Sequence, residues 1–179
     1  MQPKNFQLLA KYNQWINKKL LACAGELSEE ELKQDMGAFF GSMLGTLNHL
    51  LVADIIWLQR FANHPARFNS LELLKQMESP ETLDQQLHSD LDDLKSIRSE
   101  LDAAIVNFCE ELTDTALVTS FEYRNMKGEN FQNKLAYPLQ HFFNHQTHHR
   151  GQLTTLLNQK GIDVGVTDLL ITIRDLQPD

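Results

Sequence analysis

Apolar residues recur at spacings of three and four along much of the chain, as they do on one face of an α-helix. The first such stretch runs from Asn5 to Ala24. Its apolar positions are Phe6, Leu9, Tyr12, Ile16, Leu20 and Cys23. We therefore expect a first long helix there. Ser28 and Glu31 follow with the spacing of a capping box, which predicts a short helical turn after Ser28.

A second helix is predicted from Ser42, a good N-cap residue, to about Phe61 or Ala62. Its apolar residues are Met43, Leu44, Leu47, Leu50, Leu51, Ile55, Ile56 and Leu58. This stretch is too apolar for a helix that lies on the surface. The Asn63-His64-Pro65 sequence ends it, because the residue before a proline avoids the α region and proline lacks an amide hydrogen.

The longest periodic pattern in the chain follows a second set of helix-start signals. Ser79, Pro80 and Glu81 supply a cap, a proline at the first helical position and an early acid, so we expect the third helix to begin there. Its regularly spaced apolar residues are Leu83, Leu87, Leu91, Leu94, Ile97, Leu101, Ile105, Phe108 and Leu112. A seam of this length is suited to packing in a helical bundle.

The periodicity changes between Thr115 and Leu135, where apolar and polar residues alternate on both sides of a turn-forming segment, 125–129. This pattern predicts a small β-hairpin or an extended loop. Pro138 suits the first turn of a last long helix, about Tyr137 to Lys160, and Gly161 suits the left-handed position after its end.

A final short helix is predicted from Thr167 and Asp168. Its apolar residues are Leu169, Leu170, Ile173 and Leu176. Together the elements predict an all-α four-helix bundle, with the hairpin or loop before the last long helix. The chain has 179 residues, 42% of them apolar, and contains no internal repeat or linker, so we expect one domain over 1–179.

Composition excludes several classes of function. The net charge of −8 should repel nucleic acid and anionic membranes. No apolar run approaches the roughly 18 residues of a membrane span, and the N-terminus has no signal-peptide pattern, so we expect a cytoplasmic protein. Cys23 and Cys109 lie within apolar helical patterns, which predicts buried thiols and offers no zinc or redox motif.

The histidines are unevenly distributed. On a helix, His145 and His149 are four residues apart, about 40° around the axis and about 6 Å along it, so both rings can bind one metal ion. A third ligand must come from another element, and His49 lies in the apolar second helix beside small residues. Two other interpretations remain open. A lone His49 can donate to a backbone carbonyl in the core, and the pair can lie on an exposed polar face.

The remaining histidines fit this site less well. His148 points about 100° away from His149, and we leave it out of the ligand set. His141 can donate to a ligand or be a structural residue, whereas His64 and His88 are expected at the surface. Gln146 stands where helical zinc proteases carry their catalytic glutamate, which disfavours that class.

Longer motifs around these histidines resemble those of the DinB/YfiT-like family of damage-inducible and thiol-dependent proteins. They are residues 144–152, Asn-His-Gln-Thr-His-His-Arg-Gly-Gln, and Asn48-His49. Tyr12-Asn13-Gln14-Trp15 and Asp168-Leu169-Leu170 also look like that family, so the resemblance covers nearly the whole chain. It implies a four-helix bundle with a down-up-up-down order. It also implies a zinc or nickel ion on His49, His145 and His149.

The resemblance implies a metal-dependent S-transferase, because some relatives transfer low-molecular-weight thiols such as bacillithiol or use mycothiol to isomerise maleylpyruvate. The other interpretation is a non-catalytic, metal-stabilised stress or binding protein. His141, Arg150 and Gln152 are candidates for supporting the ligands or contacting substrate. Three imidazoles leave a coordination position open, and Asp54 should face away from the ion. A pocket lined by Trp57 or Phe142 would favour the enzyme. Similar proteins also lead us to expect a homodimer.

Overall fold

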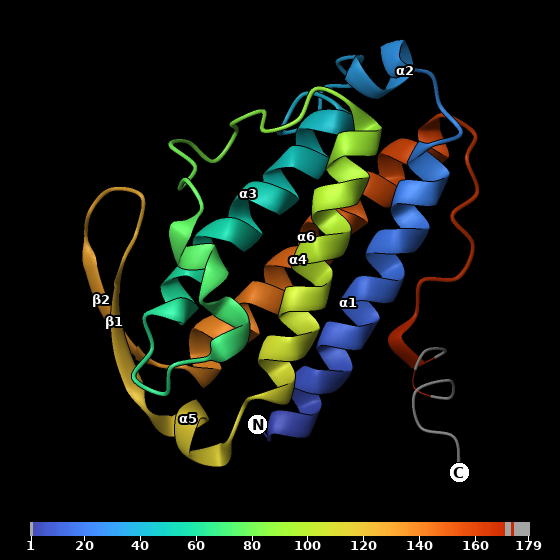
Figure 1. Cartoon of the computed structure of the whole chain (residues 1–179). Coiled ribbons are helices and arrows are strands. Elements are labelled where there is room, and N and C mark those ends of the chain that lie inside the picture. The colour runs from blue at the N-terminus through green and yellow to red at the C-terminus, as the bar shows by residue number, and fades with distance from the viewer. Residues whose placement is uncertain (1, 171–172, 174–179) are drawn as a thin grey trace.

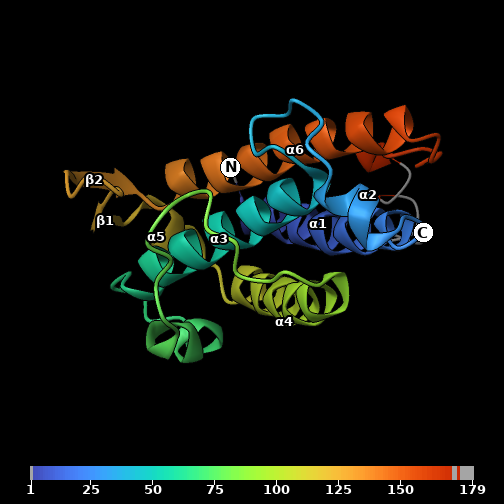
Figure 2. The same cartoon turned by 90° about the horizontal axis from the view of Figure 1, so that it is seen from above.

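Four long helices lie side by side and form most of the molecule (Figures 1 and 2). They are α1 (Pro3–Ala24), α3 (Met43–Ala62), α4 (Leu91–Glu110) and α6 (Ala136–Gln159). This computed structural model describes residues 2–170 and 173. Helix α1 packs against α4 and α6, and α3 packs against the same two helices. The chain is therefore mostly helical, as predicted, with a small antiparallel sheet beside the helices.

The first two predicted long helices are confirmed, and so are the predicted caps Ser28 and Ser42. α1 begins two residues earlier than expected, because Pro3 occupies its first turn and Asn5 accepts a hydrogen bond from the amide of Gln2. Ser28 and Glu31 form the predicted capping box of the short helix α2 (Glu29–Lys33). The Ser42 hydroxyl accepts from the Gly45 amide at 3.0 Å and starts α3.

The predicted start of the third helix at Ser79 is wrong. α4 begins at Leu91, where Asp90 accepts hydrogen bonds from the amides of Asp92 and Asp93. Residues 79–90 instead form an irregular segment, which follows the short 3₁₀ helices η1 (Asn69–Leu71) and η2 (Leu73–Gln76). Hydrogen bonds to α3 compete with a helix here: Ser79 donates to the side chain of Gln59, and the backbone of His88 is bonded to the side chain of Asn48.

The predicted hairpin is confirmed over residues 120–134, whereas residues 115–118, the start of the same predicted stretch, are helical. Strands β1 (Ser120–Arg124) and β2 (Asn130–Lys134) pair antiparallel, with Ser120 opposite Lys134, and follow the short helix α5 (Asp114–Val118). Gly161 has the expected positive φ of 80° after the last long helix. Of the predicted final helix, Leu169, Leu170 and Ile173 are helical, and Leu176 lies outside the described residues.

The core between the helices is rich in aromatic rings. Phe61 contacts Phe108, Phe121 and Phe142, with ring centroids 5.6 to 6.2 Å apart. Cys23 and Cys109 are free, buried thiols, as predicted, and burial raises the pKa of both. Among the described residues, no helix is long and apolar enough to cross a membrane.

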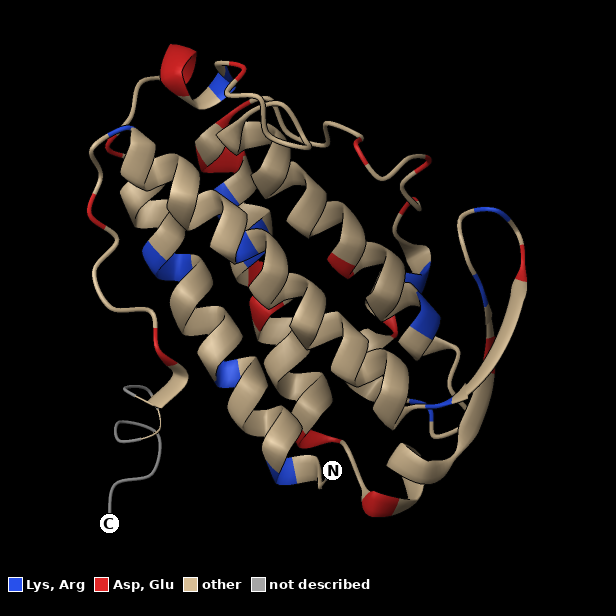
Figure 3. Ribbon diagram, turned by 180° about the vertical axis from the view of Figure 1, so that it is seen from behind, with Lys and Arg blue, Asp and Glu red and all other residues tan. Residues whose placement is uncertain are grey.

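Several acidic and basic residues lie in the middle of the long helices (Figure 3), and some of them, including Asp54, Arg98 and Asp102, are buried. The buried guanidinium of Arg98 contacts Asp54 at 2.6 Å and Asp102 at 3.1 Å. Asp102 also accepts from Asn17 at 2.9 Å. Because buried charges are costly unless they are paired, these contacts fix how α1, α3 and α4 pack together.

Candidate metal centre

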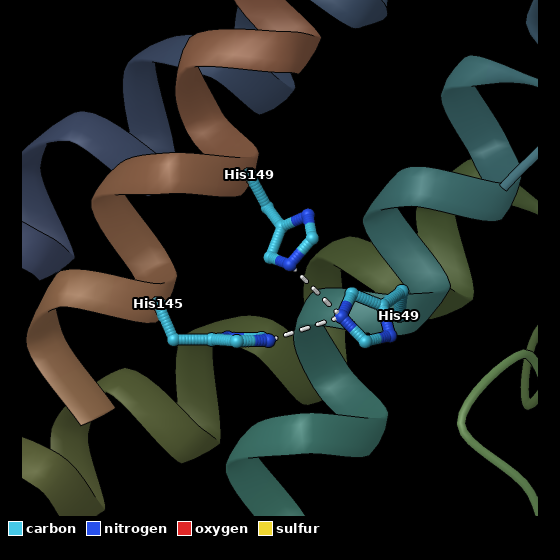
Figure 4. A group of neighbouring side chains, drawn as sticks. All are labelled: His49, His145 and His149. Carbon is cyan, nitrogen blue, oxygen red and sulfur yellow. Dashed lines mark hydrogen bonds between the residues drawn. The ribbon is translucent and has the colours of Figure 1, made fainter. Parts of the chain in front are cut away.

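Three imidazoles from two helices meet at one point (Figure 4). His145 and His149 project from successive turns of α6 towards His49 on α3. The Nε2 atom of His49 lies 3.1 Å from that of His145 and 3.2 Å from that of His149. One ring nitrogen from each residue lies within 4.8 Å of the others. The structure therefore brings together the three histidines that the sequence singled out.

Hydrogen bonds at the far side of two rings set their tautomers. The Nδ1 atom of His49 lies 2.8 Å from the carbonyl oxygen of Leu83. A carbonyl oxygen only accepts, so the ring hydrogen is on Nδ1 and the Nε2 lone pair faces the cluster. His149 donates from Nδ1 to Oε1 of Gln152 at 2.8 Å. The amide of Gln152 in turn contacts Nε2 of His148 at 3.3 Å.

The cluster favours neutral rings. The pKa of His145 is lowered to about 3, first by burial and then by the neighbouring histidines His149 and His49. Burial also lowers the pKa values of His49 and His149. Neutral imidazole is the form that ligates a metal, so no proton has to be removed near pH 7.

The donor set fits a cation. With the tautomers above, the 3.2 Å contact between His49 and His149 brings two lone pairs together. A neutral His145 ring has one N–H, so it can donate a hydrogen bond to only one of these two nitrogens. A positive ion between the three nitrogens removes this repulsion, and nitrogen donors suit zinc, nickel and similar ions.

Comparison with known proteins agrees with the motifs around these histidines. The model of the DinB family matches residues 1–178. The chain belongs to the DinB family. It is 24% identical over 160 residues to "Protein DinB" of Bacillus subtilis (strain 168), which covers 89% of this chain and 88% of that protein. No solved structure matches the chain.

In this DinB-family chain an aromatic ring covers one side of the cluster. Phe40 stacks on His49 with ring centroids 3.8 Å apart and meets His149 edge-on at 5.5 Å. Its loop lies against the first turn of α3, where a Cβ on Gly45 would be 2.1 Å from the carbonyl oxygen of Phe40. Gly45 therefore allows the loop to approach the site.

A pocket of about 350 Å³ lies on another side of the cluster. It is lined by α3, the start of α6, the hairpin tip and the irregular segment before α4. The lining residues are His49, Ala53, Ile56, Trp57, Arg60, Leu83, Asn125, Met126, Lys127, His141 and His145. Trp57 lines the pocket, whereas Phe142 is buried in the core. Two of the three histidines face a space that can hold a small molecule.

Of the other candidate residues, only His141 lines this pocket, whereas Arg150 and Gln152 do not. His141 is part of its wall, with its ring centroid 5.2 Å from that of Trp57 and 5.9 Å from that of His145. Arg150 is buried on another face of α6, where it donates to the side chain of Asn13. Gln152 bonds to the ring of His149, as described above.

Two expectations about residues outside the cluster have opposite outcomes. Asp54 faces away from the three histidines, as predicted, and bonds to Arg98 and Gln146. His64 is buried, so its expected surface position is wrong. Its Nδ1 accepts from the amide of Ala66, and burial lowers its pKa. Leu83, Phe40 and Arg60 are site residues that sequence reasoning missed, because only the folded loops and the helix face bring them there.

Proposed function

We propose that this protein binds one divalent transition metal, zinc or nickel, through His49, His145 and His149, and that it is a thiol-dependent S-transferase. The observation that carries the proposal is the convergence of neutral Nε2 atoms beside a pocket. Membership of the DinB family supports the metal site. The pocket supports an enzyme, since a purely structural metal needs no adjoining space.

The ligand set supports an open coordination position. No fourth His, Cys, Asp or Glu joins the three histidines among the described residues. When bound, the ion would lower the pKa of a thiol in contact with it and hold the thiolate next to an electrophile. Leu83 and Gln152 would keep two ligand rings oriented, and Trp57 and Ile56 would exclude water from one wall of the pocket.

The thiol has to come from a second molecule. Cys23 and Cys109 are buried, and burial raises their pKa values, so neither supplies a thiolate near pH 7. Neither residue lines the pocket. The proposed cosubstrate is therefore a low-molecular-weight thiol that enters beside His49 and His145.

The test is a turnover assay on metal-loaded protein purified without a histidine tag. Thiols are screened with chlorodinitrobenzene as the electrophile, and release of chloride and formation of the thioether are measured. We expect thiol-dependent turnover that His49→Ala abolishes and that His148→Ala, which changes an exposed neighbour of a ligand, largely retains. Metal-loaded protein without turnover for any thiol would contradict the transferase.

The second candidate is a non-catalytic, metal-stabilised stress or binding protein. The stacking of Phe40 on His49 favours it, because this ring closes one approach to the site. In that case metal should raise the melting temperature strongly, while small thiols should neither displace a ligand nor change the spectrum of a cobalt-substituted site.

We also propose that the four long helices form the down-up-up-down bundle that the family resemblance implies, as one cytoplasmic domain. A homodimer is our proposal for the assembly in solution. Light scattering should then report about twice the chain mass of 20.6 kDa. A single chain mass at all micromolar concentrations would contradict the dimer.

A further inference from the structure

The pocket beside the histidine cluster has two chemically different ends, and one face of α3 connects them. His49 lies at one end and Arg60 at the other, eleven residues further along the helix. Eleven residues are just over three full turns, so both side chains share a face and their Cα atoms are about 16 Å apart. Ala53, Ile56 and Trp57 line the space between them.

Arg60 is half-buried and has no acidic partner. Within the described part of the chain, its guanidinium makes ring contacts but no ion pair and no hydrogen bond. It stacks instead on Trp57, with the guanidinium carbon 4.6 Å from the ring centroid, and lies 5.7 Å from that of Tyr123. Stacking fixes the plane of the group and leaves its N–H donors free for an acceptor that enters the pocket.

The hairpin tip adds a second positive charge. Lys127 also lines the pocket, on a turn in which the Asn125 side chain accepts from the amides of Lys127 and Glu129 at 2.9 and 3.0 Å. No Asp or Glu is among the described residues that line the pocket, although the whole chain has 24 acidic residues and a net charge of −8. The pocket is thus locally positive in an acidic protein.

From these observations we infer a carboxylate-binding subsite at Arg60 and Lys127. The planar guanidinium accepts a carboxylate through two parallel hydrogen bonds, and Lys127 adds charge at the mouth of the pocket. Combined with the proposed function, on which this step rests, the substrate class is a thiol that carries a carboxylate several bonds away. Its thiol lies at the three histidines and its middle part contacts Ile56 and Trp57.

The subsite can be tested without metal. Hexanoate is titrated into metal-free protein while the fluorescence of Trp57 is followed in a Trp15→Phe background. We expect a saturable change that Arg60→Gln removes and that Lys127→Gln, on an exposed turn, weakens. Arg67→Gln is the matched control, because it removes the same charge from an exposed residue that does not line the pocket. Thermal melts establish that each variant is folded.

A second titration tests the link to the metal. Mercaptohexanoate and its neutral counterpart mercaptohexanol are added to cobalt-loaded protein, and the sulfur-to-cobalt charge-transfer band gives each affinity. We expect mercaptohexanoate to bind about tenfold more tightly or better, which is the range of a charge-assisted hydrogen bond. Arg60→Gln should remove this preference and Arg67→Gln should keep it.

The two titrations separate the two proposals. A hexanoate response that depends on Arg60, without any thiol band, would support the subsite and contradict the thiol chemistry. Equal affinities for the two thiols, with no response to hexanoate, would overturn the subsite and leave the thiol site standing. A hexanoate response of the same size in folded Arg60→Gln would also overturn it.

Discussion

Nδ1 of His49 lies 2.8 Å from the carbonyl oxygen of Leu83, a residue 34 positions further along the chain. Two hydrogen bonds from Asn48 hold the same irregular segment to α3. The side-chain Nδ2 of Asn48 donates to the backbone carbonyl of His88, and its Oδ1 accepts from the backbone N–H of His88, both at 2.9 Å. The orientation of one candidate ligand therefore depends on a loop, and the loop depends on Asn48.

Replacing Asn48 with alanine should loosen this loop without removing a metal ligand. We expect the metal affinity to fall by roughly ten- to hundredfold, because partners that orient a ligating histidine contribute about that much. Competition with a chromogenic chelator measures the affinity. Asn63→Ala, which removes an exposed asparagine bonded to the carbonyl of Gln59 at the end of α3, is the control and should bind as wild type.

Gly45→Ala should displace the Phe40 loop from the cluster. The added Cβ would lie 2.1 Å from a backbone oxygen, which cannot move without the loop. Overpacking of this kind costs about 1–3 kcal/mol of the free energy of unfolding, which urea titration of metal-free protein measures.

The matched change Gly151→Ala should raise the free energy of unfolding, whereas Gly45→Ala lowers it. A Cβ there would meet no atom within 4 Å, so the position is not a close packing contact within the described chain. Gly151→Ala should stabilise α6 by about 0.5–1 kcal/mol, since alanine loses less backbone entropy than glycine. Equal urea midpoints for the two variants would contradict the assigned role of Gly45.

Arg98→Met should be strongly destabilising at pH 8. It would leave Asp54 and Asp102 buried without their cation, and breaking a buried ion pair costs about 3–5 kcal/mol. Adding Asp54→Asn and Asp102→Asn to this variant removes both buried charges and should recover part of the loss. If urea unfolding showed that Arg98→Met lowers the free energy of unfolding by less than about 1 kcal/mol, the contacts would have the small energy of an exposed, well-solvated ion pair.

Acid should destabilise the metal-free protein. Folding lowers the pKa of His145 from its ordinary 6.5 to about 3. The neutral His145 ring therefore contributes fully to the free energy of unfolding above pH 6.5, and this contribution is lost as the pH falls towards 3. In this range the unfolded chain binds a proton that the folded chain does not. His145→Gln should therefore have a flatter dependence of the urea midpoint on pH between 6.5 and 4. A slope unchanged from wild type would show that His145 does not titrate as proposed.

Local sequence signals predicted the elements that are set by local contacts. Ser42, Ser28 and Gly161 cap or end helices as expected, and the alternating pattern gave the hairpin. Ser79 and Pro80 carry equally good start signals but form no helix, because hydrogen bonds to α3 compete for the segment. Contacts with another helix, which the local sequence does not reveal, therefore determine the structure of this segment.

The site was predictable where one helix determines it. His145 and His149 share a face by spacing alone, and His49 was the best remaining donor in an apolar helix. The roles of Phe40, Leu83 and Arg60 depend on loops and on a partner helix, which periodicity does not describe. The same holds for Arg98 and its carboxylates, because charged residues in mid-helix usually face solvent.

The central claim is that His49 on α3 and the pair on α6 hold one metal ion together. The most direct measurement is the metal content of protein purified without a histidine tag and reloaded with zinc or nickel. We predict one ion per chain in the wild type and in His88→Ala, whose ring lies outside the cluster. We predict a marked loss of bound metal in His49→Ala. Full stoichiometry and unchanged affinity in folded His49→Ala would contradict the cross-helix site.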